Sequence, residues 1–339
     1  MKIPITALLG ACVLPALAAA PAGIRFVHQD WELACDNTRA CRAAGYSDGE
    51  DGEAPGVSVL LTRAAGAHRP VTVELQLDSY NSDRAGAKPG AVAMRVDGRE
   101  LGQVIIDGNP MKGELNTAQA RALLEAVAAS GTVQWRHDTR TWVLSNHGAS
   151  AVMLKMDESQ GRLGTPGALL RNGAKAENGV PSPLPMPEVL APFVALAEVD
   201  LTPAARAELV RELRRALPND TCDAVAPAAV SAQRLTDVKV LVYHACWAGA
   251  SGQGTAYWVA NGAPPFKPVL VTTDGSDHAG GKISATRMMG ACVEAREWVW
   301  DGRRFAQTLV ADSGMCRTPG FEGLWNLPTY LAKVTRGPR

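Results

Sequence analysis

Short runs of β-branched and aromatic residues, separated by turn-forming Gly, Asp, Asn and Pro, recur along the chain and predict strands. In the first half these runs cover residues 24–31, 57–63, 71–77, 92–96, 103–106, 133–137 and 141–145. In the second half they cover residues 238–247, 255–260, 268–273, 283–289, 297–300 and 304–310. Because no long amphipathic helix interrupts the later series, we expect an antiparallel meander there and not a parallel sheet.

Three other stretches repeat their apolar residues at helical spacing, over residues 117–129, 149–160 and 203–217. Thr117 is the expected N-cap of the first, and Thr202 precedes a proline at the first helical position of the third. The predicted fold class is therefore α+β, with two domains that each hold a mainly antiparallel sheet and one or two helices.

Residues 172–187, NGAKAENGVPSPLPMP, carry four prolines in their last seven positions, a composition that favours an extended and rather stiff connection. We place the domain boundary here. The expected division is an N-terminal α+β domain over residues 21–171, a linker over 172–189, and a C-terminal domain rich in β-hairpins over 190–339. A chain of 339 residues is also long enough that two domains are the natural expectation.

The densest set of signals lies between Gly290 and Trp325. Two strand-like runs, residues 297–300 and 304–310, flank Asp301-Gly302, a dipeptide that suits a tight turn. Cys292 and Cys316 lie outside the two runs, so antiparallel pairing brings them towards each other. We expect a hairpin closed by a disulfide.

The first 20 residues have the layout of a signal peptide. Lys2 precedes an apolar run, and Ala16-Leu17-Ala18 fits the pattern of a cleavage site. Cys12 offers an alternative, a lipoprotein anchor, but the residues after it are apolar where a tether should be polar. We therefore expect a periplasmic or secreted protein with no transmembrane segment after cleavage, since no later apolar run reaches bilayer length.

Charge is balanced, with 34 basic and 34 acidic residues, which gives no electrostatic reason to expect nucleic acid as a partner.

Six cysteines remain after the signal segment, an even number that suits an oxidising compartment. The predicted disulfides are Cys35 with Cys41, Cys222 with Cys246 and Cys292 with Cys316. Six cysteines allow fifteen pairings, so other connectivities stay open.

Candidate catalytic residues are few. His244 and Cys246 stand two apart in a predicted strand and share a face, as a nucleophile and its base would, but a disulfide to Cys222 competes for the thiol. Asp274, Asp277 and His278 occupy one predicted turn, where they could act as acid and base, although such loops are common at hairpin ends.

No metal centre or cofactor site is predicted. The 35–41 cysteine pair lacks two further zinc ligands nearby, and residues 47–53 lack the spacing of a calcium loop. The glycines near residues 249–254 and 280–281 fit neither a dinucleotide fingerprint nor a phosphate loop. No nucleophile elbow or redox C-x-x-C motif is present in the sequence after the signal segment.

Several features together resemble a family of exported bacterial proteins defined only as domain of unknown function 1176. They are Asp30-Trp31, Cys35-Asp36-Asn37, Cys41, the run AVMLKMDESQGRLGTPG at 151–167, Cys292, the WVWDG hairpin at 298–302, and Cys316. The resemblance runs over essentially the whole chain after the signal segment. It implies that the six cysteines form a structural set, and it supplies no catalytic residue.

Two hypotheses follow. The first is a non-enzymatic envelope protein that binds a protein or glycan partner, with some of the eight tryptophans exposed for recognition; core packing is the alternative use of these aromatics. The second is a periplasmic hydrolase with a site between the domains that draws on His244, Asp274, Asp277 or His278.

Overall fold

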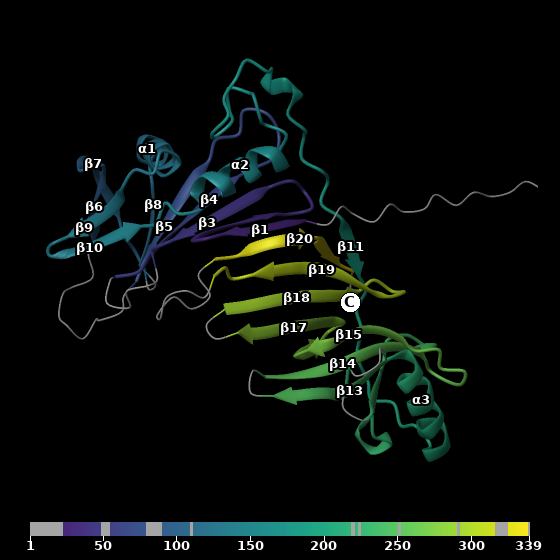
Figure 1. Cartoon of the computed structure of the whole chain (residues 1–339). Coiled ribbons are helices and arrows are strands. Elements are labelled where there is room, and N and C mark those ends of the chain that lie inside the picture. Colours follow the sequence, from purple (N-terminus) through teal and green to yellow (C-terminus); the bar gives the residue numbers. More distant parts are fainter. Residues whose placement is uncertain are drawn as a thin grey trace, which may run out of the picture.

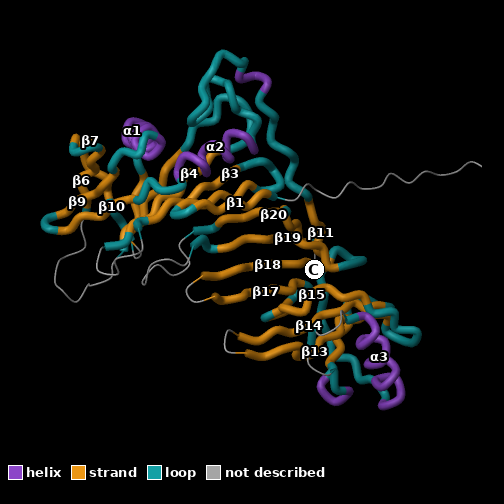
Figure 2. The backbone as a smooth tube through the Cα atoms, viewed as in Figure 1, coloured by secondary structure: helices purple, strands orange, loops and turns teal. Residues whose placement is uncertain are grey.

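The computed structural model describes residues 23–48, 55–78, 90–108, 111–217, 221–222, 225–249, 252–289, 292–315 and 325–337. Strands dominate this part of the chain, and three helices longer than one turn accompany them (Figure 2). Two predictions fall outside it: the signal segment at residues 1–20 with Cys12, and the cysteine at 316. Within the described ranges, no helix is both long enough and apolar enough to cross a bilayer.

The N-terminal half is built on an antiparallel sheet of six strands. In spatial order they are β1 (Ile24–His28), β2 (Trp31–Cys35), β3 (Cys41–Tyr46), β4 (Val57–Arg63), β5 (Thr72–Leu77) and β8 (Met111–Glu114). The single strand expected over 24–31 is in fact the whole of β1, a turn at residues 29–30 and the first residue of β2. The chain turns at Gln29, whose φ is positive at 53°.

A second antiparallel sheet and two helices cover one face of the first sheet (Figure 1). The sheet has the order β10 (Arg140–Leu144), β9 (Val133–His137), β6 (Ala91–Val96) and β7 (Arg99–Ile105). The helices are α1 (Thr117–Ala128) and α2 (Ala149–Ser159). Residues from all of these elements form one buried core that includes Trp31, Trp135, Trp142 and Met153.

The N-cap of α1 differs from the expected Thr117. Asn116 is the N-cap: its carboxamide oxygen accepts hydrogen bonds from the backbone N–H groups of Ala118 and Gln119, both at 3.0 Å. The Gln119 side chain in turn accepts from the Asn116 N–H, which completes a capping box. The expectation was wrong because Asn116 with Gln119 three residues later satisfies three backbone donors, whereas Thr117 is followed three residues later by Ala120, which cannot complete a capping box.

The C-terminal half contains two antiparallel sheets and α3 (Pro203–Ala216). One sheet has the order β12 (Ser231–Arg234), β13 (Lys239–Gly249), β14 (Gly252–Asn261), β15 (Val269–Gly275). The other has the order β16 (Asp277–Ala279), β17 (Lys282–Met289), β18 (Cys292–Trp300), β19 (Phe305–Asp312), β20 (Leu327–Leu331). The expected antiparallel meander and the β18–β19 hairpin, with Gly302 at φ 95°, are present.

The β13–β14 sheet is buried on both faces. One face packs against α3 through a core that contains Leu209, Leu213, Val242 and Trp258. The other face carries the alternate residues of the same strands, including Leu241 and Tyr257, which pack against Ile283 of β17 and Trp300 of β18. The face that a residue of β13 occupies therefore decides which of two separate cores it joins.

The two halves meet where β20 lies beside the first sheet (Figure 1). Ala34, Ala44, Tyr46 and Leu60 project from the sheet face opposite the main N-terminal core, and they pack against Trp325 and Leu327. The Trp325 indole donates a 2.8 Å hydrogen bond to Ser58 Oγ across this contact. Two-domain organisation with a boundary in residues 172–189 stays a prediction.

Two predicted disulfides are present. Cys35 and Cys41 are direct cross-strand partners in the β2–β3 hairpin. Cys222, in the segment after α3, is bonded to Cys246 of β13. The pairing of Cys292 stays a prediction, because its expected partner is outside the described residues.

Candidate functional site

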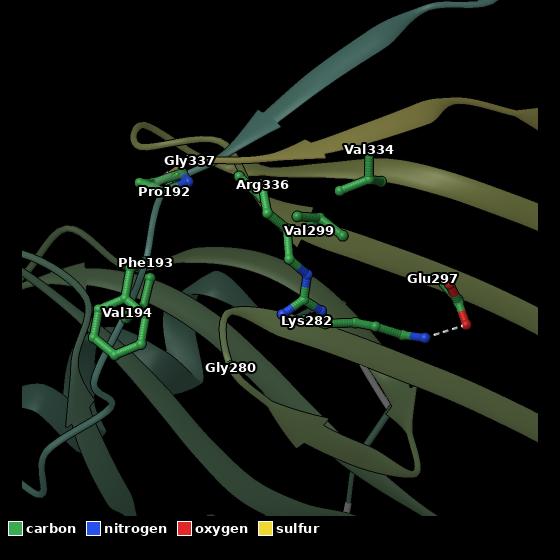
Figure 3. Close-up of a pocket in the computed structure, with 11 residues that line it drawn as sticks. Pro192, Phe193, Val194, Gly280, Lys282, Glu297, Val299, Val334, Arg336 and Gly337 are labelled. Atoms are coloured by element: carbon green, nitrogen blue, oxygen red, sulfur yellow. Dashed lines mark hydrogen bonds and ion pairs between the residues drawn. The ribbon is translucent and has the colours of Figure 1, made fainter. Parts of the chain in front are cut away.

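A hollow lies between the β17–β18 sheet and a small two-stranded ribbon, and we call it the ribbon pocket (Figure 3). The ribbon consists of β11 (Glu188–Ala191) and β21 (Lys333–Arg336), which pair in parallel. The pocket has a volume of about 410 Å³, within the range of small-molecule sites. Its walls come from segments about 140 residues apart, so it exists only in the folded chain.

The pocket forms because the C-terminal strand changes partner. The N–H of Ala332 donates to Thr308 O in β19, whereas the N–H of the next residue, Lys333, donates to Pro187 O beside β11. From that point the chain runs with β11 as the ribbon and no longer pairs with β19. The outer face of β17 and β18 is thereby left partly uncovered beneath the ribbon.

Charged side chains line one side of the pocket. Lys282 of β17 forms an ion pair with Glu297 of β18, drawn as a dashed line in Figure 3. Arg336 extends from β21 towards Lys282 (Figure 3). Within the described part of the chain, the Arg336 guanidinium has no hydrogen-bond or ion-pair partner. The pocket therefore holds two cations and one anion, an excess of one positive charge.

Apolar side chains line the other side. Phe193, in the segment after β11, is 63% exposed, and Val334 of β21 is 38% exposed. Val194 and Val299 are buried beneath them and form the floor. An exposed aromatic ring and an unpaired positive charge that line one hollow are an arrangement suited to binding, because both groups gain from being covered by a ligand.

The predicted candidate His278 lies outside this pocket, in β16, and it belongs to a hydrogen-bonded network. The Gln233 amide donates to Glu198 at 2.7 Å, so its oxygen accepts from His278 Nε2 at 3.0 Å. His278 Nδ1 then accepts from the Tyr257 hydroxyl at 3.1 Å. The imidazole also packs against the Tyr243 ring, with centroids 4.6 Å apart.

Burial lowers the pKa of His278 and raises the pKa of Tyr257 to about 12. The imidazole is therefore neutral near pH 7 and the phenol is protonated. Both ring nitrogens of His278 therefore have hydrogen-bond partners within the protein.

His244 is in β13, on the face of the β13–β14 sheet that points away from His278. It is 6% exposed and directed towards the α3 core, whereas Tyr243 and Tyr257, which hold His278, point to the other face. Its Nε2 accepts from the Ala226 N–H at 3.4 Å, and burial lowers its pKa. The structure thus does not bring His244 and His278 into one site.

The other predicted candidates, Asp274, Asp277 and Cys246, do not form a catalytic group with either histidine. Asp274 accepts a 3.2 Å hydrogen bond from the Trp247 indole, and Asp277 lies opposite Ser284 in the β16–β17 pair. Cys246 is in a disulfide, so the thiol needed for a nucleophile with His244 is absent. Within the described ranges, no three His, Cys, Asp or Glu residues are arranged to hold a metal ion.

Of the two uses considered for the eight tryptophans, exposure for recognition and core packing, the structure shows core packing. Six of the eight are buried, and Trp247 and Trp298 are half-buried. The tryptophans therefore serve the cores. The exposed aromatic group at the ribbon pocket is Phe193. The sequence analysis did not predict Phe193, Arg336 or Lys282 as site residues. The only local signal was an apolar residue shortly after a proline-rich segment.

Comparison with known proteins gives a family match but no activity. Residues 25–332 match the family described as "Protein of unknown function (DUF1176)". The chain is similar to the "Uncharacterized protein YpfG" of Escherichia coli (strain K12), with 25% identity over 337 residues, covering 88% of this chain and 90% of that protein. No solved structure matches the chain.

Proposed function

The chain belongs to the DUF1176 family of proteins of unknown function, and on that premise we propose that it is an exported envelope protein that acts by binding, with the ribbon pocket as its binding site. The proposed compartment is the periplasm or the cell exterior. The proposed mode of action is capture of a ligand by a largely preformed pocket, without chemical conversion.

Export is supported by the sequence and by cysteine chemistry. The first 20 residues have a signal-peptide pattern, and disulfides such as Cys35–Cys41 and Cys222–Cys246 persist in oxidising compartments. The Cys246 side chain is fully buried, so its disulfide is protected from reductants in solution. Both features favour a location outside the cytoplasm.

Binding without catalysis is supported by the state of the titratable candidates. A general base needs a free lone pair within reach of a substrate proton. His278 has both nitrogens engaged, and His244 is buried against a different core. Neither residue lines the ribbon pocket.

The observation that carries the proposal is the combination of Phe193 and Arg336 at one hollow. The exposed ring offers apolar contact area and the guanidinium offers up to five hydrogen-bond donors. Such a combination binds an anionic ligand that has an apolar part. Lys282 and Glu297 lie on the same charged side as Arg336 and are joined by their ion pair.

The test is native mass spectrometry of the protein purified from the periplasm, together with a turnover screen on ester, phosphoester, glycoside and peptide substrates. We expect a bound species or an added anionic ligand to be retained by the wild type. We expect Phe193→Asp to lose it, because a carboxylate at the pocket repels the anion and removes the aromatic surface.

The matched control is Val238→Asp, which places the same charge on a residue that is 68% exposed and does not line the pocket. It should retain the ligand. Turnover that disappears in His278→Gln would overturn the proposal in favour of a hydrolase. Equal ligand retention by Phe193→Asp and the wild type would remove the ribbon pocket as the site.

A further inference from the structure

Resting on the proposed binding function, we propose that the ligand of the ribbon pocket is the C-terminal residue of a peptide that ends in an apolar side chain, with its terminal carboxylate held by Arg336. The inference combines three features of the pocket: its charge, its apolar wall and the free edge of β21. Each restricts the ligand in a different way.

The charge of the pocket fits one carboxylate. Lys282 is already neutralised by Glu297, so among the described residues that line the pocket the Arg336 guanidinium is the charge without a counterion. A guanidinium presents two parallel N–H donors that match the two oxygens of a carboxylate. One anionic group with this geometry therefore restores neutrality.

The apolar wall belongs to the same hollow as that charge. Phe193, Val334 and Val299 line the same hollow of about 410 Å³ as Arg336. A ligand that fills it must carry its apolar group next to its carboxylate. The last residue of a peptide has this arrangement when its side chain is apolar, because the side chain and the carboxylate leave the same Cα atom.

The free edge of β21 supplies the peptide-binding element. Lys333 N donates to Pro187 O and Gly337 N donates to Ala191 O, so the odd-numbered residues of β21 direct their backbone groups towards β11. The backbone groups of Val334 and Arg336 therefore point away from β11. Among the described strands, none pairs with β21 on that side, so an extended peptide can add there as a further strand.

The experiment is isothermal titration calorimetry of the full periplasmic protein with the tripeptide Ala-Ala-Phe and with the same tripeptide amidated at its C-terminus. We expect the free acid to bind, and the amide to bind about tenfold more weakly because it lacks the charge-assisted hydrogen bonds. Arg336→Ala should weaken binding of the free acid by about the same factor and make acid and amide equal.

Arg99→Ala is the matched control, since Arg99 is exposed in β7 and does not line the pocket. It should leave both affinities unchanged, and thermal denaturation of each variant verifies folding. Equal binding of acid and amide by the wild type would overturn the inference. So would 3-phenylpropionate, which has the same carboxylate and ring but no peptide backbone, if it bound as tightly as the tripeptide.

The two proposals fail in different ways. If the tripeptide does not bind but another ligand is retained and is lost in Phe193→Asp, the inference about peptide termini is overturned and the binding function stands. If Phe193→Asp alters the retention of no ligand, the ribbon pocket is overturned as the binding site, and the proposed function fails with it.

Discussion

The hydroxyl of Tyr46 donates a 2.7 Å hydrogen bond to the Glu32 carboxylate, and the backbone N–H of Met315 approaches the same carboxylate oxygen at 2.6 Å. Tyr46 and Glu32 belong to the N-terminal sheet, whereas Met315 belongs to the segment that follows β19. Both side chains are buried. A buried carboxylate thus joins the two halves of the chain, and burial raises the pKa of Tyr46 well above its ordinary value.

We expect Tyr46→Phe to destabilise the protein by about 1–3 kcal/mol, because the buried Glu32 carboxylate loses a hydrogen-bond donor. Chemical denaturation of the purified protein measures this change. Tyr330→Phe is the control: the Tyr330 hydroxyl has no hydrogen bond to any residue that the structure describes, so its removal should change stability by less than about 0.5 kcal/mol. Equal effects of the two substitutions would contradict the role assigned to the Tyr46–Glu32 bond.

The position of Glu32 also shows why pattern reasoning could find β2 but not its environment. The strand reads WELAC, and alternation predicts that Glu32 faces solvent. All five residues are buried, because a segment almost 300 residues later covers the polar-looking face. The local sequence determines that residues 31–35 form a strand. A segment far away in the sequence determines whether the face that carries Glu32 is exposed or buried.

Removing one partner of a second buried pair should lower the free energy of unfolding more than removing one partner of an exposed ion pair. Arg63 and Asp157 are 1% and 0% exposed and lie 2.6 Å apart, and the Asp157 carboxylate also accepts the backbone N–H of Leu169 at 2.7 Å. Burial lowers the pKa of Arg63, and Asp157 acts in the opposite direction. Asp157→Ala leaves an unpaired buried guanidinium, and we expect a loss of about 3–5 kcal/mol in the free energy of unfolding.

The control for this pair is Glu125→Ala on α1, which removes the exposed ion pair with Arg121. Exposed pairs at this helical spacing contribute about 0.3–0.5 kcal/mol, so the change should be small. The interpretation would be wrong if urea denaturation gave similar losses for Asp157→Ala and Glu125→Ala.

The two observed disulfides should contribute unequally to the free energy of unfolding. Cys222 and Cys246 are 24 residues apart in sequence, and Cys35 and Cys41 are 6 apart. The chain-entropy relation gives about 3.5 kcal/mol for the longer loop and about 2.4 kcal/mol for the shorter one. We expect the double variant Cys222→Ala/Cys246→Ala to be less stable than Cys35→Ala/Cys41→Ala by about 1 kcal/mol in guanidinium denaturation. The reverse order would contradict loop closure as the main effect.

The ribbon pocket could not be predicted from the sequence. The Asp301-Gly302 hairpin was predictable because its turn residues and both strands lie within a few positions of one another. By contrast, β11 and β21 have four residues each, and Glu188 pairs with Lys333, 145 positions away. Neither strand has enough local pattern to be recognised, so the meeting of Phe193 and Arg336 appears only once the chain is folded.

Two histidines make stability depend on pH. Burial lowers the pKa of both His244 and His278 in the folded protein, whereas an unfolded histidine titrates at its ordinary value of 6.5. The folded state therefore binds fewer protons than the unfolded state below that value. The stability that results is fully present above about pH 6.5 and is lost as the pH falls through 6.5 towards the lower folded pKa values.

We expect His244→Gln to reduce this acid sensitivity. Between pH 7.5 and pH 5.5, one histidine that stays neutral in the folded state accounts for at most about 1.4 kcal/mol of lost stability, and glutamine has no proton to gain. The free energy of unfolding from urea titrations at the two pH values should therefore differ less in the variant than in the wild type. His68→Gln, at an exposed position, serves as the control and should keep the wild-type difference. If His244→Gln kept that difference too, burial of His244 would not be a source of the pH dependence.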